Sequence, residues 1–254
     1  MVTVGEIYRA IDEIAPFASA LEFDNAGLLV GSAEQQVFRV MLALDITPEV
    51  VGEAVKSGAQ LIVSHHPVIF HPIRNLLAES VPYLLAQHGI AAICAHTNLD
   101  MAPLWGVNAA LADALGLENV CAMTKHDGNA ETVIGTIPEC APQAFAAFVR
   151  QKLDRPAVEY CEGNRTVRRV ALCSGAGGEF FNDAIKAGAD AFVTGEVKHH
   201  EWLLARENGL TVVCAGHFGT ENIVMERLQN FLQGRFTGLQ VQKALSSQDP
   251  VCWI

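Results

Sequence analysis

Histidine and carboxylate side chains recur in this chain shortly after short apolar runs. Such runs are typical of fully buried strands. Two of them are followed by a histidine and, four positions later, by a carboxylate: His96 with Asp100, and His217 with Glu221. Imidazole and carboxylate at this spacing suit a divalent metal ion. One metal centre where the strand ends converge is therefore the simplest interpretation.

A third apolar run ends in the adjacent histidines His65 and His66. Successive side chains at a strand end point in opposite directions, so these imidazoles are expected to hold two neighbouring ions rather than one. Glu221 follows His217 by one helical turn and has the reach to bridge such ions, which lie about 3.5 to 4 Å apart in two-metal sites. The donor set predicts two divalent metal ions per chain, and zinc, iron, manganese and nickel all suit it.

The elements that lead to these residues are repeated. Residues 54–66 and residues 184–196 both read as the end of a helix, a glycine and a buried strand. This pattern predicts an internal duplication. We expect an α/β fold of two related lobes, with mixed, mainly parallel central sheets flanked by helices and the metal site in the cleft between the lobes. The first lobe is expected to span residues 1–120 and the second residues 121–254, because residues 117–130 include a polar, turn-rich stretch.

Periodicity and capping signals locate the individual elements. Thr3 and Glu6 form a capping-box pattern at the first helix. Helices are expected at residues 3–14, 48–57, 81–87, 108–115, 142–153, 198–208 and 221–232. Strands are expected before His96, Glu196 and His217 and at residues 28–30, 40–44, 61–64, 132–137, 167–173 and 239–242.

Composition excludes several classes of protein. Half of the 254 residues are apolar (50%), enough for a substantial core. No run approaches the roughly twenty apolar residues of a membrane span, and the N-terminus lacks a signal-peptide pattern, so we expect a cytoplasmic protein with no membrane partner. A net charge of -11 makes duplex DNA an unfavourable partner. The seven cysteines have no metal-binding or redox spacing and are expected to be buried thiols.

Five motifs together carry a resemblance that covers essentially the whole chain. They are DNAGL at residues 24–28, SHHP at 64–67, HTNLD at 96–100, GE at 195–196 and GHFGTE at 216–221. This set is similar to that of the type 2 GTP cyclohydrolase I-like family, also known as the NGG-interacting-factor-three-like family. The resemblance implies a two-lobed α/β subunit, a dinuclear metal site and a toroidal homohexamer. It also implies that the metal ligands are His65, His66, Asp100, His217 and Glu221.

The expected function is that of a metal-dependent hydrolase of small molecules. Its substrate is expected to be a nucleotide or a compound with a cyclic amide bond. On GTP, which the family name proposes, attack at the imidazole carbon of guanine would open the ring and release formate. His96, just outside the implied ligand set, is the candidate catalytic residue for proton transfer. The alternative is a non-catalytic metal-binding regulatory or assembly protein. Five protein ligands leave positions open on two ions, as catalysis requires.

Three further features keep two interpretations each. His199 and His200, beside Glu196, either contact substrate or are solvated on a helix. The glycine-rich loop at residues 174–178 either presents amides to a phosphate or forms a tight turn between a strand and a helix, and it matches no phosphate-binding fingerprint. The role of Glu196 is open as well.

Overall fold

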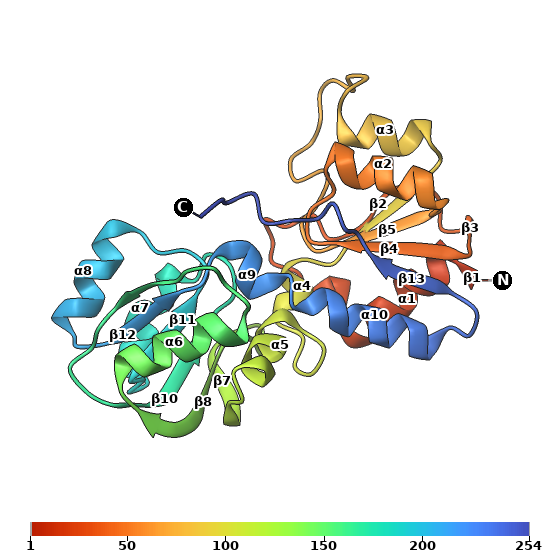
Figure 1. The fold of residues 1–254 in the computed structure, drawn as a ribbon. Helices are drawn as coiled ribbons and strands as arrows, with labels where there is room; N and C mark the ends of the chain where they lie inside the picture. The colour runs from red at the N-terminus through yellow and green to blue at the C-terminus, as the bar shows by residue number, and fades with distance from the viewer. Residues whose placement is uncertain (1, 254) are drawn as a thin grey trace. The chain divides into compact units, whose positions relative to one another are not determined.

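The computed structural model describes residues 2–253, and its contacts divide the chain into two compact units. Unit 1 comprises Met1–Leu99 and Val224–Gln248, and unit 2 comprises Asp100–Ile223 and Asp249–Ile254. Each unit has a mixed sheet flanked by helices, so the α/β fold class expected from the sequence is confirmed (Figure 1). Among residues 2–253, no helix has the length and apolar character needed to cross a membrane.

Unit 1 contains a five-stranded sheet in the order β13-β4-β5-β6-β2. Its strands are β2 (Gly27–Val30), β4 (Arg39–Ala43), β5 (Leu61–Ser64), β6 (Ala91–Cys94) and β13 (Gln240–Lys243). All neighbours pair in parallel except β2, which runs antiparallel to β6 at one edge. A separate two-stranded sheet pairs β1 (Val2–Thr3) with β3 (Gln36–Val37).

Helices cover both faces of this sheet, which is why its central strands are apolar throughout rather than alternating. The helices of unit 1 are α1 (Val4–Ile14), α2 (Pro48–Ser57), α3 (Val81–Gln87) and α10 (Val224–Arg235), with a short 3₁₀ helix η1 (Phe17–Ser19). In Figure 1, α2 and α3 lie on one face and α1 and α10 on the other. The capping box of Thr3 and Glu6 is present at the start of α1.

Unit 2 contains a six-stranded sheet in the order β7-β8-β10-β11-β12-β9. Its strands are β7 (Glu118–His126), β8 (Asn129–Cys140), β9 (Glu159–Cys161), β10 (Val167–Leu172), β11 (Ala191–Thr194) and β12 (Thr211–Cys214). Its helices are α5 (Val107–Ala114), α6 (Pro142–Lys152), α7 (Phe181–Lys186), α8 (His199–Glu207) and α9 (His217–Glu221), with the 3₁₀ helix η2 (Gly178–Phe180). The remaining helix, α4 (Thr97–Asp100), contains the point in the sequence where unit 1 ends, at Leu99, and unit 2 begins, at Asp100.

The two sheets share one arrangement. In each, three successive parallel strands (β4-β5-β6 and β10-β11-β12) are followed at the edge by an antiparallel strand, β2 or β9. Helices connect the parallel strands in the same order, α2 and α3 in unit 1 and α7 and α8 in unit 2. This correspondence is what a duplicated ancestral unit would leave, and it supports our proposal of an internal duplication.

The division into units differs from the lobes drawn from the sequence. Residues 117–130, expected to separate the lobes, form the strand β7 and the turn of its hairpin with β8 inside unit 2. The C-terminal segment 224–248 belongs to unit 1, because β13 pairs with β4, about 200 residues earlier. A pairing over this distance leaves no local signal in the sequence.

Candidate metal centre

Three histidines follow the carboxyl ends of two neighbouring strands of unit 1. β5 ends directly before His65 and His66, and β6 ends two residues before His96. Because these strands are parallel, with Ser64 opposite Cys94, all three histidines reach the same edge of the sheet. One ligand atom from each histidine lies within 4.8 Å of the others. We call His65, His66 and His96 the first ligand group.

His65 and His66 have different partners at Nδ1, yet their rings lie close together. Their ring centroids are 5.0 Å apart, and both belong to the first ligand group. The alternation of side chains requires extended strand geometry, which ends at Ser64. The two rings can therefore turn toward one another.

Each histidine of the first ligand group has its Nδ1 atom held by an oxygen. His65 Nδ1 lies 2.9 Å from the Ala95 carbonyl, His66 Nδ1 lies 2.7 Å from Asp45 Oδ1, and His96 Nδ1 lies 2.8 Å from Asp24 Oδ1. A carbonyl or ionised carboxylate can only accept, so Nδ1 carries a proton and Nε2 is the nitrogen of each ring that can ligate an ion. This outer arrangement is typical of histidines that ligate a metal ion. The donor set of the first ligand group therefore fits a divalent ion.

Asp24 contacts both His96 and the next residue in the chain, Thr97. Its other carboxylate oxygen accepts hydrogen bonds from the amide and hydroxyl of Thr97, at 3.0 and 2.6 Å. Burial acts to raise the pKa of Asp24, but the hydrogen bonds from His96 and Thr97 outweigh it and lower the pKa from 3.8 to about 2. Asp24 thus stabilises the fold above its ordinary pKa, and this contribution is lost as the pH falls toward 2.

The second ligand group lies in unit 2 and consists of Asp100, His217 and Glu221. Helix α9 begins at His217, so Glu221 lies one turn further on the same face, as the sequence predicted. His217 Nε2 lies 3.0 Å from Glu221 Oε2, and His217 Nδ1 lies 2.8 Å from Glu196 Oε1. One carboxylate oxygen of Asp100 lies within 4.8 Å of one of Glu221.

The Glu221 carboxylate, with Glu196, raises the pKa of His217 to about 9, although burial acts in the opposite direction. In the metal-free protein His217 is therefore protonated at neutral pH and is held between two carboxylates. An ion bound at Nε2 must displace that proton, so metal binding at the second ligand group releases protons and weakens as the pH falls below about 9.

Two glycines allow the loops of unit 2 to approach helix α9. Gly175 has a φ of +60°, and a Cβ atom there would lie 3.2 Å from Glu221 Cδ and closer still to its Oε1 atom. A Cβ atom on Gly195 would lie 2.8 Å from His217 Cα. The Gly195 amide also donates to the Gly175 carbonyl, at 2.8 Å. These close contacts fix the backbone around the second ligand group, and a larger residue at either position would displace it.

The glycine-rich loop at residues 174–178 uses three of its amides internally. The amide of Ser174 donates to Asn108, that of Gly175 to Thr220, and that of Gly177 to Thr194. Amides committed to these acceptors are not directed at a phosphate. These contacts favour the second interpretation of the sequence, a tight turn between β10 and η2.

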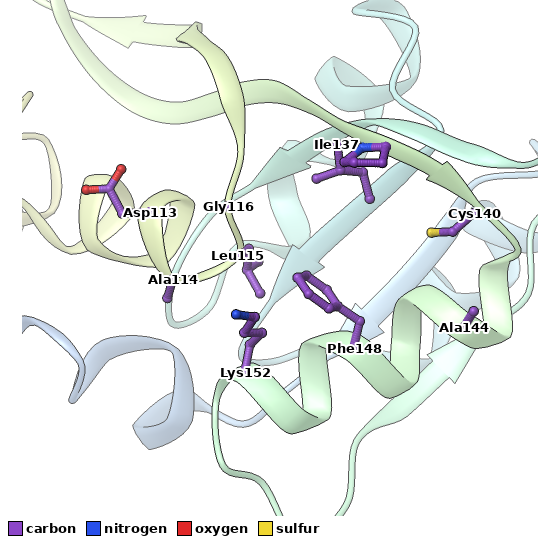
Figure 2. Close-up of a pocket in the computed structure, with 10 residues that line it drawn as sticks. Asp113, Ala114, Leu115, Gly116, Ile137, Cys140, Ala144, Phe148 and Lys152 are labelled. Carbon is purple, nitrogen blue, oxygen red and sulfur yellow. The ribbon is translucent and has the colours of Figure 1, made fainter.

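A hollow of about 350 Å³ in unit 2 lies away from the second ligand group. Phe148 and Lys152 of α6, Leu115 after α5, and Ile137 and Cys140 of β8 line it (Figure 2). β8 runs antiparallel to β10, so this end of β8 lies at the amino edge of the parallel strands. His217 follows the carboxyl end of β12. The hollow and the second ligand group therefore occupy opposite edges of one sheet.

Comparison with known proteins shows the family of the chain. The family model for Duf34/NIF3 (NGG1p interacting factor 3) matches residues 2–250. The chain belongs to the Duf34/NIF3 family. A Streptococcus pneumoniae protein named "GTP cyclohydrolase 1 type 2 homolog" is 34% identical over 239 residues, 89% of each chain. A Clostridium perfringens protein of the same name is 31% identical over 241 residues, 91% of this chain and 92% of the relative.

A solved structure supports the fold. The crystal structure of a Staphylococcus aureus hypothetical protein superposes with a TM-score of 0.93 at 28% identity, covering 100% of this chain and 99% of that one. The resemblance to the GTP cyclohydrolase type 2-like, NIF3-like family that the five motifs indicated is thus confirmed.

In this Duf34/NIF3 chain, the sequence identified the residues of both ligand groups but not all their partners. Asp45, which holds His66, follows the strand β4 as a single carboxylate with no pattern around it. Asp24 belongs to a recognised motif, yet its contact with His96 spans 72 residues. The available signal was a carboxylate shortly after a buried strand, since Asp45 lies two residues after β4.

The partner of His66 gives a first prediction. Asp45→Asn should lower the affinity for metal roughly 10- to 100-fold. The asparagine side chain has no negative charge, so it holds the protonated Nδ1 atom of His66 less strongly than the Asp45 carboxylate does. Competition of the protein with a metal-sensitive dye measures the change. Asp127→Asn, on the exposed turn between β7 and β8, is the control and should retain wild-type affinity. Equal affinities in the two variants would contradict the assigned role of Asp45.

Proposed function

We propose that this chain is a metal-dependent hydrolase of small molecules, acting on a nucleotide or a cyclic amide bond. The observation that carries the proposal is the outer arrangement of the histidines: His65, His66, His96 and His217 each have Nδ1 held by a carbonyl or carboxylate oxygen. Histidines oriented in this way are typical of metal sites. The names of the bacterial relatives add the expectation of a GTP-like substrate.

In this proposal His65, His66, Asp100, His217 and Glu221, the ligands that the family resemblance implies, would hold two divalent ions, with Glu221 shared by both. His96 belongs to the first ligand group by distance but would stay outside this ligand set. With no thiolate in the set, zinc, iron, manganese and nickel are all compatible. When bound, such ions would supply an acidified water and polarise the bond under attack. Four histidines or carboxylates besides the bridge leave coordination positions for the substrate.

The remaining residues of the site orient groups and move protons. His96 is proposed to accept a proton at Nε2 and return it to the leaving group, while ionised Asp24 stabilises the imidazolium that forms. Glu196 contacts Nδ1 of His217 and so orients this imidazole ring at the start of α9. On a guanine nucleotide, hydrolysis at the imidazole carbon would open that ring and lead to the release of formate.

A smaller hollow of about 250 Å³ adjoins Glu196. Lys198 supplies the cation among the residues that line it, and Glu179 and Glu201 supply further carboxylates. Glu201 accepts a hydrogen bond from the Lys198 amide, at 2.6 Å, and so fixes the start of α8. We propose that this hollow receives a polar part of the substrate.

The direct test of the proposed function is restoration of activity by metal. Protein stripped with a chelator and then reloaded with zinc, iron, manganese or nickel is assayed against nucleotides, phosphoesters and cyclic amides. We expect the protein to turn over at least one of these substrate classes. This turnover should disappear when the metal is stripped and return when one of the metals is added. Metal binding without turnover of any class would favour the non-catalytic regulatory or assembly protein instead.

We further propose that the chain assembles into a toroidal homohexamer in the cytoplasm, without a membrane or duplex DNA as partner. The family resemblance supports the assembly, and the apolar half of the composition is compatible with extensive burial between subunits. Light scattering coupled to size exclusion should report about six times the chain mass of 27.3 kDa. A monomer throughout the micromolar range would contradict the assembly and leave the metal chemistry untouched.

A further inference from the structure

Two aromatic rings are exposed beside the first ligand group. Phe23 is 64% exposed and Phe70 is 39% exposed, although both are large apolar side chains. Their ring centroids lie 6.4 Å apart with the planes tilted by 49°. Residues of this kind are normally buried when they serve packing alone. An exposed pair of rings in mutual contact is therefore a candidate recognition surface.

The aromatic pair is adjacent to a histidine that we assign to catalysis. The Phe70 ring centroid lies 6.4 Å from that of His96, at an interplanar angle of 77°. Phe70 also meets His71 edge-on, with centroids 4.8 Å apart. A flat molecule lying against Phe70 would therefore be next to the first ligand group.

The dipeptide after Phe23 fixes both the histidine and the aromatic loop. Asp24 holds His96 by its Nδ1 atom, and the side-chain amide of Asn25 donates to the Ile69 carbonyl, at 2.5 Å. The loop that carries Phe70 is thus tied to the segment that orients His96. A surface held in this way is preorganised, which lowers the entropic cost of binding.

We propose that Phe70, with the tilted ring of Phe23 beside it, forms a stacking platform for a flat heteroaromatic ring of the substrate. The inference deepens the proposed function, on which it rests, by naming a substrate class: a nucleobase or a ring of similar size and polarity. Every nucleobase has a π face, and stacking on an aromatic side chain strengthens binding with little dependence on sequence or substituents. His96, whose ring centroid lies 6.4 Å from that of Phe70, would then lie near the stacked ring, within reach for proton transfer.

The test compares ligands with and without a base on the metal-loaded protein. Calorimetry gives the affinity for GTP, guanosine, a pterin and inorganic tripolyphosphate. Phe70→Leu and Phe23→Leu should weaken binding of the ring-containing probes roughly 5- to 100-fold, the range for loss of one base stack. Binding of tripolyphosphate should be unchanged. Phe70→Tyr keeps the π face and should remain within about twofold of wild type.

Phe38→Leu is the matched control. Phe38 is 54% exposed, but it precedes the amino end of β4, whereas Asp45 and the first ligand group lie at the carboxyl edge of the sheet. This variant should bind all four probes like the wild type. An equal loss in Phe38→Leu would show that any exposed phenylalanine matters, and it would overturn the platform.

Failure of the platform and failure of the hydrolase are distinguishable. If no ring-containing probe binds the wild type, or if Phe70→Leu binds them equally well, the platform is wrong, even where metal-dependent turnover of another substrate is found. Ring binding that depends on Phe70 without any turnover would uphold the platform and reject the hydrolase.

The same loop exposes Ile73, Leu76 and Leu77. A Phe70→Leu variant that changes the mass in light scattering but not the probe affinities would assign the surface to contacts between copies, which also overturns the platform.

Discussion

Replacement of Glu221 by glutamine should lower the metal content from two ions per chain to less than one. Glu221 is the proposed bridge, so its loss removes a ligand from both ions, and the affinity should fall by at least about 100-fold, the upper end of what loss of an outer partner costs. The glutamine side chain keeps the shape that packs against Gly175. Elemental analysis of the purified variant measures the result.

A second measurement on the same variant separates the loss of a ligand from a loss of fold. In metal-free protein, Glu221→Gln should lower the pKa of His217 from about 9, because the Glu221 carboxylate is the main cause of the raised value. Proton NMR titration of the histidine ring reports it. Glu207→Gln, at the exposed end of α8, is the control for both measurements. Two ions retained in the Glu221→Gln protein would rule out the bridging assignment.

The same pKa affects stability. A proton held by His217 in the folded, metal-free state stabilises the fold below the ordinary pKa of 6.5, and this contribution is lost as the pH rises through about 9. Bound metal replaces the proton, so the loss should be absent in the loaded protein. Metal-free protein should therefore show the steeper decline in stability with rising pH.

The parts of the fold that could be predicted from sequence are those with a local cause. β5, β6, β11 and β12 are each four residues long and fully buried, so each reads as a continuous apolar run. The polar residues that follow them stand out for the same reason. Helix α2 was equally clear, since Thr47 caps it, Pro48 opens it and Gly58 ends it in the left-handed conformation.

The parts that could not be predicted depend on exposed or distant residues. β7 is mostly exposed and carries no alternating apolar pattern, so its residues resembled a linker. β9 has three residues and joins the sheet only by pairing with β12. Asp24 contacts His96, 72 residues later in the chain, and Asp45 contacts His66, 21 residues later. The sequence therefore identified the candidate ligand residues, whereas the orientation of their side chains depends on contacts that only the three-dimensional structure shows.

Replacement of Asp100 by asparagine should reduce turnover by at least about 100-fold while the protein remains folded. Asp100 lies at the end of α4, and Ser174 Oγ is 3.5 Å from its Oδ1 atom. It is proposed as a carboxylate ligand, so the substitution removes a negative charge from the second ligand group without altering the apolar strands behind it. Asparagine has almost the same volume, and thermal unfolding should shift little.

The assay compares steady-state turnover in four preparations: wild type, Asp100→Asn, chelator-stripped wild type, and Asp127→Asn as the exposed control. Asp100→Asn and the stripped protein should lose turnover together, since both lack part of the metal site, and Asp127→Asn should match the wild type. Adding excess metal should restore the stripped protein but only partly restore Asp100→Asn, whose defect is in the ligand. Turnover that persists unchanged in Asp100→Asn and in the stripped protein would mean that the ions are structural, and the chain would then be a metal-binding assembly protein rather than a metal-dependent hydrolase.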